Sequence, residues 1–416
     1  MSNNNKTPAI RFKGFTDPWE QRELRTAATF SKGSGYSKND LKENGTPIIL
    51  YGRLYTKYET VISEVDTFVD VQPNSVYSTG HEVIVPASGE TAEDISRASF
   101  VAKSGILLGG DLNIIVPDDY INPVFLALTI SNGNQQKELS KRAQGKSVVH
   151  IHNSDLENVV LLYPKYEEQE KIGEYFSKLD TLITLHQRKC DKLIQFKAAM
   201  LKKMFPQNGA DKPELRFKGF TDAWEQRKLG ELMEITSVKR IHQSDWTDSG
   251  VRFLRARDIV AVSKNEEVSE PLFISQEKYD EYSALSGKVK IGDLLVTGVG
   301  TIGVPMLINN EEPLYFKDGN IIWFKNEDRI DGEFFYHSFN GSFIQNFIKE
   351  SAGIGTVGTY TIESGKKTPI LLPTQKDEQQ KIGTFFSQLD TLITLHQRKC
   401  DKYKSIKAGL IRKFFP

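Results

Sequence analysis

The stretch LDTLITLHQRKCDK, from Leu179 to Lys192, occurs a second time without a single change from Leu389 to Lys402. The two copies lie 210 residues apart (389 − 179). Identity over such a length does not arise by chance, and this period is far longer than that of a solenoid repeat. The chain therefore contains a duplicated unit, which predicts internal pseudo-two-fold symmetry like that of a symmetric dimer.

The similarity extends to both sides of this stretch. EEQEKIGEYFSKLD precedes the first copy, and DEQQKIGTFFSQLD precedes the second. Closer to the N-terminus, PAIRFKGFTDPWEQREL (box 1, residues 8–24) matches PELRFKGFTDAWEQRKL (box 2, residues 213–229) at an offset of 205 (213 − 8). The order is thus box, variable stretch and long helix, twice. The aromatic residues Phe15 and Trp19 recur as Phe220 and Trp224, so we predict that they anchor each box in a core.

The composition is that of a soluble globular protein. The 416 residues allow two to four domains, and 38% are hydrophobic and 26% charged. We find no apolar run near the roughly 20 residues of a membrane span, and MSNNNKTPAI lacks the apolar core of a secretory signal. The two cysteines, Cys190 and Cys400, are the same repeat position, which argues against a disulfide framework or a zinc site. We therefore expect a cytoplasmic protein with no metal site and no membrane partner.

The formal net charge is zero, but the charges are unevenly distributed. From Lys171 to Lys203 there are eight basic and three acidic residues, and from Lys381 to Lys413 eight basic and two acidic ones. The helical repeats are thus basic and the variable stretches acidic overall. Net charge by itself indicates neither nucleic acid nor membrane as a partner.

Residues 25–164 and 230–373 carry short apolar, β-branched runs between clusters of Gly, Pro, Asn and Asp, which predicts short strands and turns. Examples are HEVIVPAS and LNIIVP in the first stretch and GDLLVTGVG and GNIIWFKN in the second. INPVFLALTISN and DGEFFYHSFNGSFIQNFI have helical patterns. We therefore predict an α+β fold. Its two mixed α/β domains, each including its box, are residues 1–164 and 207–373, and the long helices that follow them are residues 165–206 and 374–416.

Apolar positions in the two predicted helices follow heptad steps of four and three, which is typical of a coiled coil. The predicted seam consists of Ile172, Phe176, Leu179, Ile183, His186, Cys190 and Leu193 in the first helix and Ile382, Phe386, Leu389, Ile393, His396, Cys400 and Tyr403 in the second. The pseudo-symmetry requires an antiparallel pair. About 35 residues give a rod of roughly 50 Å, which we expect to hold the variable domains apart.

Two glycine-rich motifs resemble nucleotide-binding loops without their context. Gly298, Gly300 and Gly303 satisfy G-x-G-x-x-G, but Pro305 interrupts the helix that must follow, so we predict a tight turn between strands. Gly145-Lys146-Ser147 resembles the end of a phosphate-binding loop, but the required first glycine is Ser140.

Other enzyme motifs fail in the same way. Asn122-Pro123-Val124-Phe125 lacks one proline of the Asn-Pro-Pro-Phe motif of amino-methyltransferases and is better explained as a capped helix start. His186 and His396 lie on the helix seam without partners at metal-ligand spacing, so we interpret them as packing or polar contacts across the pair. We find no catalytic triad and no catalytic carboxylate pair.

The boxes RFKGFTDxWEQRxL, the variable domains with PASGETAEDIS or TGVGTIG, and the helices xEQxKIGxxFSxLDTLITLHQRK together resemble the specificity subunit of type I restriction-modification enzymes. The resemblance covers almost the whole chain, and the doubled arrangement makes it specific. It implies two target-recognition domains, each reading one half of a split double-stranded DNA target. It also implies two helices that space these domains and bind two methyltransferase subunits.

The resemblance further implies a non-catalytic chain in a host-defence complex for DNA methylation and restriction. Restriction subunits complete this complex, and S-adenosylmethionine, ATP and Mg²⁺ belong to the partner subunits, so we expect no cofactor in this chain. The predicted rod of roughly 50 Å agrees with this function, because half-sites read on one face of DNA lie about 34 Å or somewhat more apart. Two dissimilar domains predict an asymmetric bipartite target.

Candidates for reading base edges are Arg, Lys, Gln and small polar residues near Gly-rich turns, since Arg and Lys favour guanine and Gln favours adenine in the major groove. In the first domain they are Lys32, Tyr36, Arg53, Ser88, Gly89, Glu90, Thr91, Arg97, Lys141, Arg142, Gln144 and Lys146. In the second they are Lys239, Arg240, Arg255, Arg257, Thr297, Gly298, Gly300, Thr301, Gly355, Thr356, Thr359 and Tyr360. The SGE and TGVG loops are equally compatible with a purely structural role.

Two other classes of function stay open at this point. A self-sufficient DNA methyltransferase or nuclease would bind S-adenosylmethionine as an isolated chain, but the glycine-rich and Asn-Pro-Pro-Phe motifs are missing. A structural scaffold with no DNA role would bind duplexes without sensitivity to sequence or salt.

Overall fold

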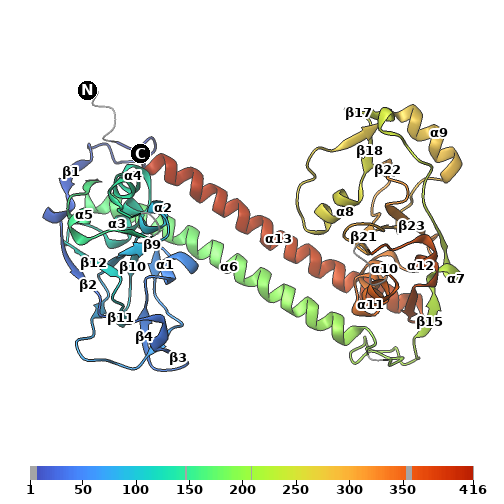
Figure 1. Ribbon diagram of the computed structural model, residues 1–416, viewed down its shortest axis with the longest axis horizontal. Helices are drawn as coiled ribbons and strands as arrows, with labels where there is room; N and C mark the ends of the chain where they lie inside the picture. Colours follow the sequence, from blue (N-terminus) through green and yellow to red (C-terminus); the bar gives the residue numbers. More distant parts are fainter. Residues whose placement is uncertain (1–6, 146–147, 208, 353–357, 416) are drawn as a thin grey trace. The chain divides into compact units, whose positions relative to one another are not determined.

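The computed structural model describes residues 7–145, 148–207, 209–352 and 358–415. It divides into two compact units (Figure 1). Unit 1 runs to Arg188 and takes in the C-terminal segment from His396, and unit 2 is Lys189–Leu395. Each unit therefore contains one box, one variable domain and one half of each long helix.

Unit 1 is a mixture of short strands and helices. Its strands are β1 (Glu20–Glu23), β2 (Ala28–Lys32), β3 (Leu41–Lys42), β4 (Thr46–Ile49), β5 (Val61–Ile62), β6 (Phe68–Val69), β7 (Tyr77–Thr79), β8 (Val83–Pro86), β9 (Ser88–Gly89), β10 (Ser99–Val101), β11 (Ser104–Leu108), β12 (Leu112–Pro117), β13 (Val149–His150) and β14 (Val160–Tyr163). Its helices are α1 (Arg53–Thr56), α2 (Ala92–Ile95), α3 (Pro123–Ile130), α4 (Gly133–Arg142), α5 (Asn153–Glu157) and the first part of α6 (Tyr166–Met204).

Two five-stranded sheets organise unit 1, in the orders β2-β12-β8-β10-β5 and β3-β6-β4-β11-β7. Ile115 of β12 lies opposite Phe30 of β2 and Val83 of β8. Helix α3, apolar on all sides, is buried from Phe125 to Ile130 in the same core. Asn122 caps it by accepting the Phe125 amide at 3.1 Å, and proline takes the first turn, so the helix-start reading of this motif is confirmed.

The C-terminal end of the chain completes the core of unit 1. Phe414 and Phe415, at the end of α13 (Lys376–Phe414), are buried there, with Phe415 5.9 Å from Phe125 and Phe414 5.7 Å from Phe176 between ring centroids. The Ala9 amide donates to the Lys413 carbonyl at 2.9 Å. Box 1 thus packs against the far end of the chain.

Unit 2 repeats this plan. Its strands are β15 (Glu225–Lys228), β16 (Glu234–Thr236), β17 (Trp246–Thr247), β18 (Val251–Leu254), β19 (Leu272–Ile274), β20 (Leu294–Thr297), β21 (Pro305–Leu307), β22 (Leu314–Phe316), β23 (Ile321–Lys325) and β24 (Pro369–Leu372). Its helices are α7 (Leu229–Leu232), α8 (Ala256–Ser263), α9 (Gln276–Ser286), α10 (Gly332–Phe339), α11 (Ser342–Ser351), α12 (Ile362–Lys367), the end of α6 and the start of α13.

Sheets β16-β23-β20-β21 and β17-β19-β18-β22 form the framework of unit 2. At the end of α6, Phe205 stacks on Phe334 with centroids 5.5 Å apart and lies 5.9 Å from Phe386. The Leu215 amide donates to the Lys203 carbonyl at 2.8 Å. In unit 1 the N-terminal box and the C-terminal end of the chain make the equivalent contacts. The box and the helix end therefore pack in the same way in both units.

The two long helices have the same length and the same ends. Each has 39 residues, or about 58 Å at 1.5 Å per residue, slightly more than the sequence predicts. Prolines 164 and 373 precede them, acidic residues occupy the first turn and lysines or arginines the last, which complements the helix dipole. The predicted boundaries at 164 and 373 fall next to the helix starts.

Contacts within each unit establish the direction of the helices. In unit 1, Lys407 pairs with Asp180 at 2.5 Å and His396 contacts His186, so later residues of α13 meet earlier residues of α6. In unit 2, Lys197 pairs with Asp390 at 2.5 Å while the Cys190 thiol reaches the Ile393 carbonyl at 3.9 Å. The halves of α6 and α13 are antiparallel in both units, and the predicted fold class is confirmed.

The boxes make the same contacts in both units. Arg11 forms two hydrogen bonds with the buried Glu168 carboxylate, at 2.9 and 2.6 Å, and Arg216 forms two with Glu378, at 2.8 and 2.6 Å. Lys171 lies 4.8 Å from the Phe15 ring centroid, and Lys381 lies 4.8 Å from that of Phe220. Trp19 and Trp224 are buried, so the prediction that box aromatic residues anchor in a core is confirmed for the tryptophans.

Several sequence expectations need correction. The segment from Asp331 to Ile348 is not one helix but two, α10 and α11, because Asn340 and Gly341 end the first and cap the second. Helices α4 and α9 have polar sequences with few apolar residues and were not predicted. The glycine-rich loop after Thr297 joins the antiparallel strands β20 and β21, as the tight-turn interpretation requires.

Candidate nucleic-acid interface and helix surface

The predicted seam residues lie on the inward face of each long helix. Ile172, Phe176 and Leu179 are part of the unit 1 core, and Ile382, Phe386 and Leu389 are part of the unit 2 core. His186, Cys190 and Cys400 are buried, whereas Ile183, Leu193, Ile393, His396 and Tyr403 are half-buried. The start of each seam therefore packs against its own variable domain as well as against the opposite helix.

His186 and His396 form a polar contact within the seam of unit 1. Their Nδ1 atoms are 2.8 Å apart, and their ring centroids are 5.1 Å apart. A hydrogen bond between two imidazole nitrogens requires one protonated and one unprotonated nitrogen. At least one ring therefore presents an unprotonated Nδ1. The Tyr403 ring stacks on His186, with ring centroids 5.7 Å apart.

Unit 1 brings three of the candidate base readers together. Strand β9, which is Ser88 and Gly89, pairs with β13, and Ser88 Oγ lies 3.1 Å from His150 Nδ1. The backbone of Gln144 exchanges hydrogen bonds with that of His150, at 3.2 and 2.8 Å. Glu90 and Thr91 follow directly and are exposed, with Thr91 capping α2. These residues form one surface cluster, to which the structure adds His150.

Other candidates of unit 1 have structural contacts. The Tyr36 hydroxyl is buried and lies 2.5 Å from Ser75 Oγ. Arg53 is held by Asp66 and Glu59, at 2.7 and 2.8 Å. Arg97 pairs with Asp94 at 2.8 Å, and Arg142 pairs with Glu138 at 2.7 Å. Lys32 and Lys141 are exposed, and Lys146 lies outside the described residues.

The charges around Arg53 shift the titration of one acidic group. Lys57 and Arg53 both hydrogen-bond the Asp66 carboxylate, at 2.8 and 2.7 Å, and lower its pKa to about 2. Asp66 is therefore ionised throughout the physiological range.

In unit 2, Lys239 and Arg240 are exposed. The Lys239 ammonium lies 5.3 Å from the Tyr282 ring centroid, and Arg240 Nε donates to Asp318 at 2.8 Å. Both side chains keep donors at the surface while their position is defined by a neighbour.

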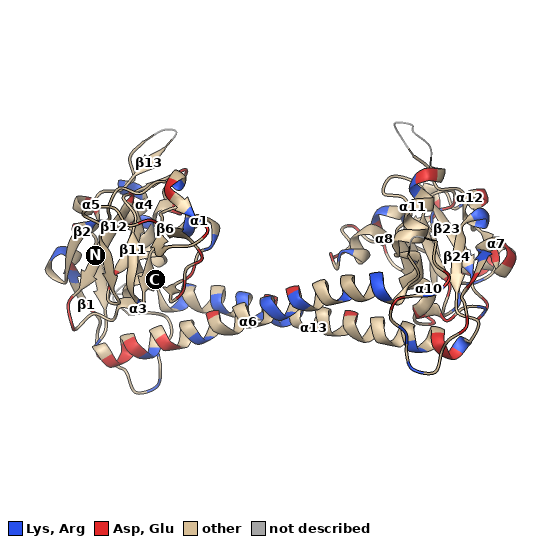
Figure 2. Cartoon of the chain, turned by 90° about the horizontal axis from the view of Figure 1, so that it is seen from below, with Lys and Arg blue, Asp and Glu red and all other residues tan. Residues whose placement is uncertain are grey.

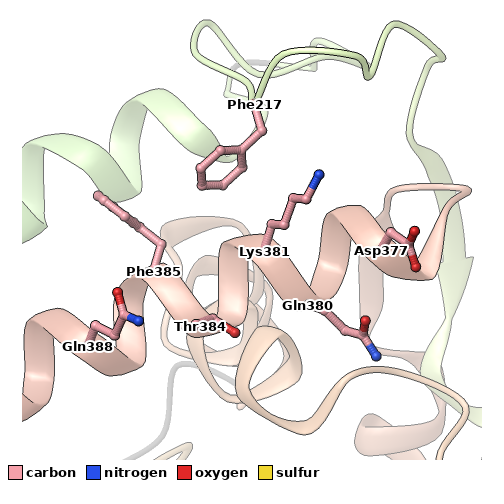
Figure 3. A pocket seen from close by; sticks show the side chains of 7 residues that line it. All are labelled: Phe217, Asp377, Gln380, Lys381, Thr384, Phe385 and Gln388. Carbon is pink, nitrogen blue, oxygen red and sulfur yellow. The ribbon is translucent and has the colours of Figure 1, made fainter.

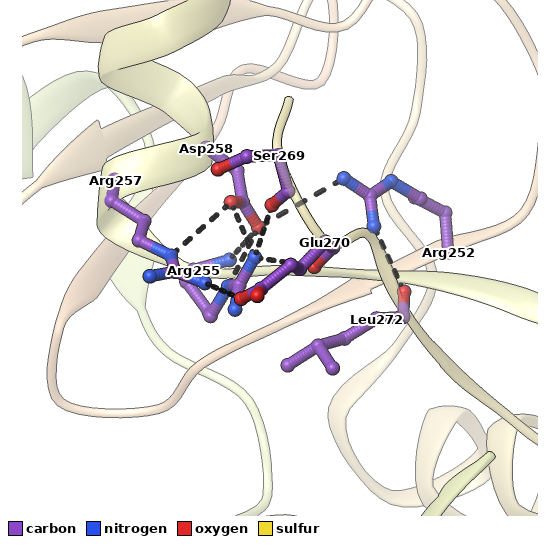
Figure 4. A network of polar contacts seen from close by, with 7 residues as sticks. All are labelled: Arg252, Arg255, Arg257, Asp258, Ser269, Glu270 and Leu272. Atoms are coloured by element: carbon purple, nitrogen blue, oxygen red, sulfur yellow. Dashed lines mark hydrogen bonds and ion pairs between the residues drawn. The ribbon is translucent and has the colours of Figure 1, made fainter. Parts of the chain in front are cut away.

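Arg255 and Arg257 belong to a cluster around one carboxylate (Figure 4). Arg255 donates to both oxygens of the buried Asp258, at 3.1 and 3.0 Å, and to the Glu270 carbonyl at 2.8 Å. Arg252 donates to the Leu272 carbonyl at 2.9 Å and lies 3.9 Å from Asp258. Burial, with a contribution from Arg255, lowers the pKa of Arg252. The Arg257 side chain is 57% exposed.

Hydrogen bonds of the buried Thr297 side chain fix the glycine-rich loop of unit 2. Thr297 Oγ1 donates to the Thr301 carbonyl at 2.5 Å and accepts the Val304 amide at 3.0 Å. Gly298 is buried, and a side chain there would meet the Tyr360 carbonyl at 2.7 Å. Gly300 and Thr301 are exposed at the turn.

Four further candidates of unit 2 lie beyond this loop. Tyr360 is buried, and its hydroxyl contacts Thr368 Oγ1 at 2.6 Å. Thr359 is exposed. Gly355 and Thr356 lie outside the described residues.

A hollow lies beside the exposed face of α13 in unit 2 (Figure 3). Its volume is about 500 Å³, and it is lined by Phe217 of box 2 and by Asp377, Gln380, Lys381, Thr384, Phe385 and Gln388. A second hollow of about 440 Å³ shares Thr384 and Gln388 and continues toward Thr391 and Leu392. Both hollows are lined by a mixture of polar and apolar residues.

The same aromatic contact occurs at the matching place in unit 1. Phe12 and Tyr175 meet edge to face with centroids 5.8 Å apart, as Phe217 and Phe385 do at 6.2 Å. Beyond their acidic first turns, both helices carry rows of Lys and Arg (Figure 2). Each unit therefore offers a similar box-and-helix surface.

The sequence did not single out Arg252, Asp258 or His150. Arg252, Arg255 and Arg257 with Asp258 form the run RFLRARD, whose density of charge next to a predicted strand was a usable signal. His150 had no such signal, because only strand pairing brings it to Ser88.

The type I restriction modification DNA specificity domain matches residues 16–195 and 221–404 of this chain. The chain belongs to this specificity family. Each matched segment falls within one copy of the repeat. Among the described residues, every helix is too short or too polar to span a membrane.

Known specificity subunits resemble the chain over most of its length. The type I restriction enzyme MjaVIII specificity subunit of Methanocaldococcus jannaschii is 24% identical over 362 residues, covering 83% of this chain and 80% of that protein. The putative MjaX specificity subunit of the same organism is 22% identical and covers 95% and 92%. The crystal structure of the type I restriction-modification S subunit from M. genitalium has the same fold, with a TM-score of 0.66, 15% identity and 99% coverage of both chains.

Proposed function

We propose that this specificity subunit is a non-catalytic DNA-recognition chain in which each unit reads one half of a bipartite, asymmetric double-stranded target. The observation that carries the proposal is the contrast between the repeated contacts of the boxes and the different surfaces of the two variable domains. A shared framework with two different surfaces suits two different half-sites. A single enzymatic site would not require it.

We infer that the base readers come from the exposed members of the candidate set. In unit 1 these are Glu90, Thr91 and Gln144 of the surface cluster, with the half-buried Ser88 beside them, together with Lys32 and Lys141. In unit 2 they are Lys239, Arg240, Arg257, Thr301 and Thr359. The buried candidates Tyr36, Arg53, Arg255, Thr297 and Tyr360 act as supports in this proposal, because their polar atoms already have protein partners.

The helices set the spacing between the half-sites and dock two methyltransferase subunits. Two observations support this part of the proposal. The helix length of about 58 Å accommodates half-sites a helical turn or more apart. The box-and-helix surface with its aromatic pair occurs twice, which suits two copies of one partner.

In the complete complex, we propose that restriction subunits join through the methyltransferase subunits. S-adenosylmethionine, ATP and Mg²⁺ bind to those partners and not to this chain. The complex acts in the cytoplasm on double-stranded DNA.

Exchange of one variable domain tests the modular reading. Residues 25–164 would be replaced by the corresponding segment of another specificity subunit, and the methylated motif would be read by sequencing modified bases. We expect one half of the motif to change while the other half and the spacer stay the same. A change in both halves, or in neither, contradicts the proposal.

A further inference from the structure

Strand β4 of unit 1 and strand β18 of unit 2 occupy corresponding positions. They begin 205 residues apart (251 − 46), the same offset as the boxes. Each pairs in parallel with a later strand, β11 or β22, and each leads into a helix, α1 or α8. We call the segments that follow these strands the junctions: Leu50–Arg53 in unit 1, which ends at the first residue of α1, and Arg255–Asp258 in unit 2, which includes the first turn of α8.

Both junctions end in a buried charge, but its sign is reversed. In unit 1 the charge is Arg53, 8% exposed, held by Glu59 and Asp66. In unit 2 it is Asp258, 1% exposed, held by Arg255 at 3.0 Å with Arg252 and Arg257 at 3.9 Å (Figure 4). The two charged positions are 205 residues apart (258 − 53).

Part of the unit 2 cluster is helix capping, because the Asp258 carboxylate also accepts the Arg255 backbone amide at 2.9 Å at the start of α8. Removing charges from water is unfavourable, and apolar residues of similar volume serve as well or better in most buried positions. Two unrelated sets of residues nevertheless place a neutralised buried charge at the same point of both units. A fixed junction, which holds the neighbouring exposed side chain in one orientation, explains this arrangement.

The neighbouring residue is Arg257 in unit 2 and Gly52 in unit 1. No atom lies within 4 Å of the position that a side chain at Gly52 would occupy, so this place is open in unit 1. Arg257 Nη2 lies 3.5 Å from Glu270 Oε2, and its Nε lies 3.9 Å from Asp258 Oδ1. Both distances are longer than those of a firm ion pair, and Glu270 is itself 85% exposed, so the guanidinium lies beside two carboxylates but stays available to a ligand.

We propose that Arg257 determines specificity by reading a guanine in the half-site recognised by unit 2, with Asp258 and Arg255 as its positioning residues. The inference rests on the proposed function. An oriented guanidinium matches the O6 and N7 acceptors of guanine in the major groove, and this pairing is the commonest specific contact of arginine. A phosphate contact would strengthen binding without discriminating between sequences, so the two kinds of contact give different results in the test below.

The test compares methylated motifs in cells that carry this chain with its methyltransferase partner. The variants are Arg257→Ala, Arg257→Lys and, as a control at the C-terminal end of the same helix, the exposed C-cap variant Lys264→Ala. The half-site of unit 2 is the half that survives exchange of residues 25–164. For Arg257→Ala and Arg257→Lys we expect about ten- to hundredfold weaker discrimination at one guanine of that half-site. The other half and the spacer stay unchanged, and Lys264→Ala matches the wild type.

The possible outcomes distinguish failure of this inference from failure of the proposed function. An unchanged motif in both Arg257 variants overturns the inference, and so does a uniform fall in methylation, which would identify a phosphate contact. Retention of the guanine in Arg257→Lys, when Arg257→Ala loses it, also contradicts bidentate reading. Absence of any motif dependent on the wild-type chain contradicts the proposed function itself.

Discussion

The two units agree where the box meets the long helix and differ where strand β4 or β18 leads into the helix that follows it. Arg11–Glu168 and Arg216–Glu378 are the same bidentate pair made twice. Arg53 and Asp258, by contrast, are opposite charges at matching positions. The comparison indicates which parts of the molecule form a common framework and which parts can vary with the target.

The largest effect should follow loss of a framework carboxylate. Glu168→Ala in unit 1 and Glu378→Ala in unit 2 each leave a largely buried arginine with only a backbone carbonyl as partner and no carboxylate, and loss of a buried ion-pair partner typically costs about 3–5 kcal/mol. Urea unfolding, with hydrogen exchange to identify the unit, measures the loss. The exposed neighbours Glu167→Ala and Asp377→Ala are matched controls and should change stability by less than about 0.5 kcal/mol. Equal effects in mutants and controls would show that the ion pairs are incidental.

The next effect concerns the closing phenylalanines. Phe415→Ala should destabilise unit 1 and Phe205→Ala unit 2, by about 3 kcal/mol each, because both rings are buried among aromatic side chains. The exposed Phe196→Ala is the control. If Phe415→Ala leaves unit 1 as stable as before, the chain end does not complete that core.

A third prediction concerns the acid sensitivity that His337 gives to unit 2. His337 is buried, and burial, reinforced by Lys197, lowers its pKa to about 3. Asp390 and Glu333, at 3.8 and 3.9 Å, favour protonation, but Asp390 is already paired with Lys197, so burial dominates. Between pH of about 6.5 and about 3, the unfolded state then binds more protons than the folded state. Unit 2 should therefore lose stability as pH falls, by at most about 1.4 kcal/mol per pH unit.

Leu128 is the corresponding residue of unit 1, because α3 and α10 begin 209 residues apart (332 − 123) and so do these two positions (337 − 128). His337→Leu should flatten the pH dependence of unit 2 toward that of unit 1. Unfolding curves recorded from pH 7 to pH 4 measure it. Parallel pH profiles of wild type and variant would contradict the assignment.

The smallest effect belongs to the ion pairs between the helices. Asp180→Asn and Asp390→Asn should each cost about 0.5–1 kcal/mol and less at high salt, because all four charged groups are partly solvated. Asp180 also accepts the Thr60 hydroxyl at 3.1 Å, so its loss should be the larger of the two. Thermal unfolding at low and high salt compares the variants, and a salt-independent loss would point to packing as the cause.

The duplication explains why so much of the fold can be predicted from the sequence. The identical stretches that begin at Leu179 and Leu389 predict equivalent helices, and the matching offset of the boxes locates the two domains. The heptad spacing predicts an inward face. It does not reveal that Phe176 packs with Phe414, because residues far apart in the chain supply that contact.

The candidate site was less accessible to sequence reasoning. Arg53 and Asp258 share no residue type, and their equivalence emerges only from strand pairing and offset. Tyr360 and Thr297 looked like surface polar residues, but their hydroxyls bond inside the fold. Exposure, and therefore availability to DNA, is a property of the tertiary structure.

The most direct test of the account is the methylome of cells that carry this chain with its proposed methyltransferase partner, compared with cells from which only this chain is deleted. The account predicts a gapped, asymmetric motif, methylated on both strands, that disappears on deletion. Its two halves would belong to the two units. A methylome that retains this motif after deletion would contradict the central claim that this chain selects the DNA target.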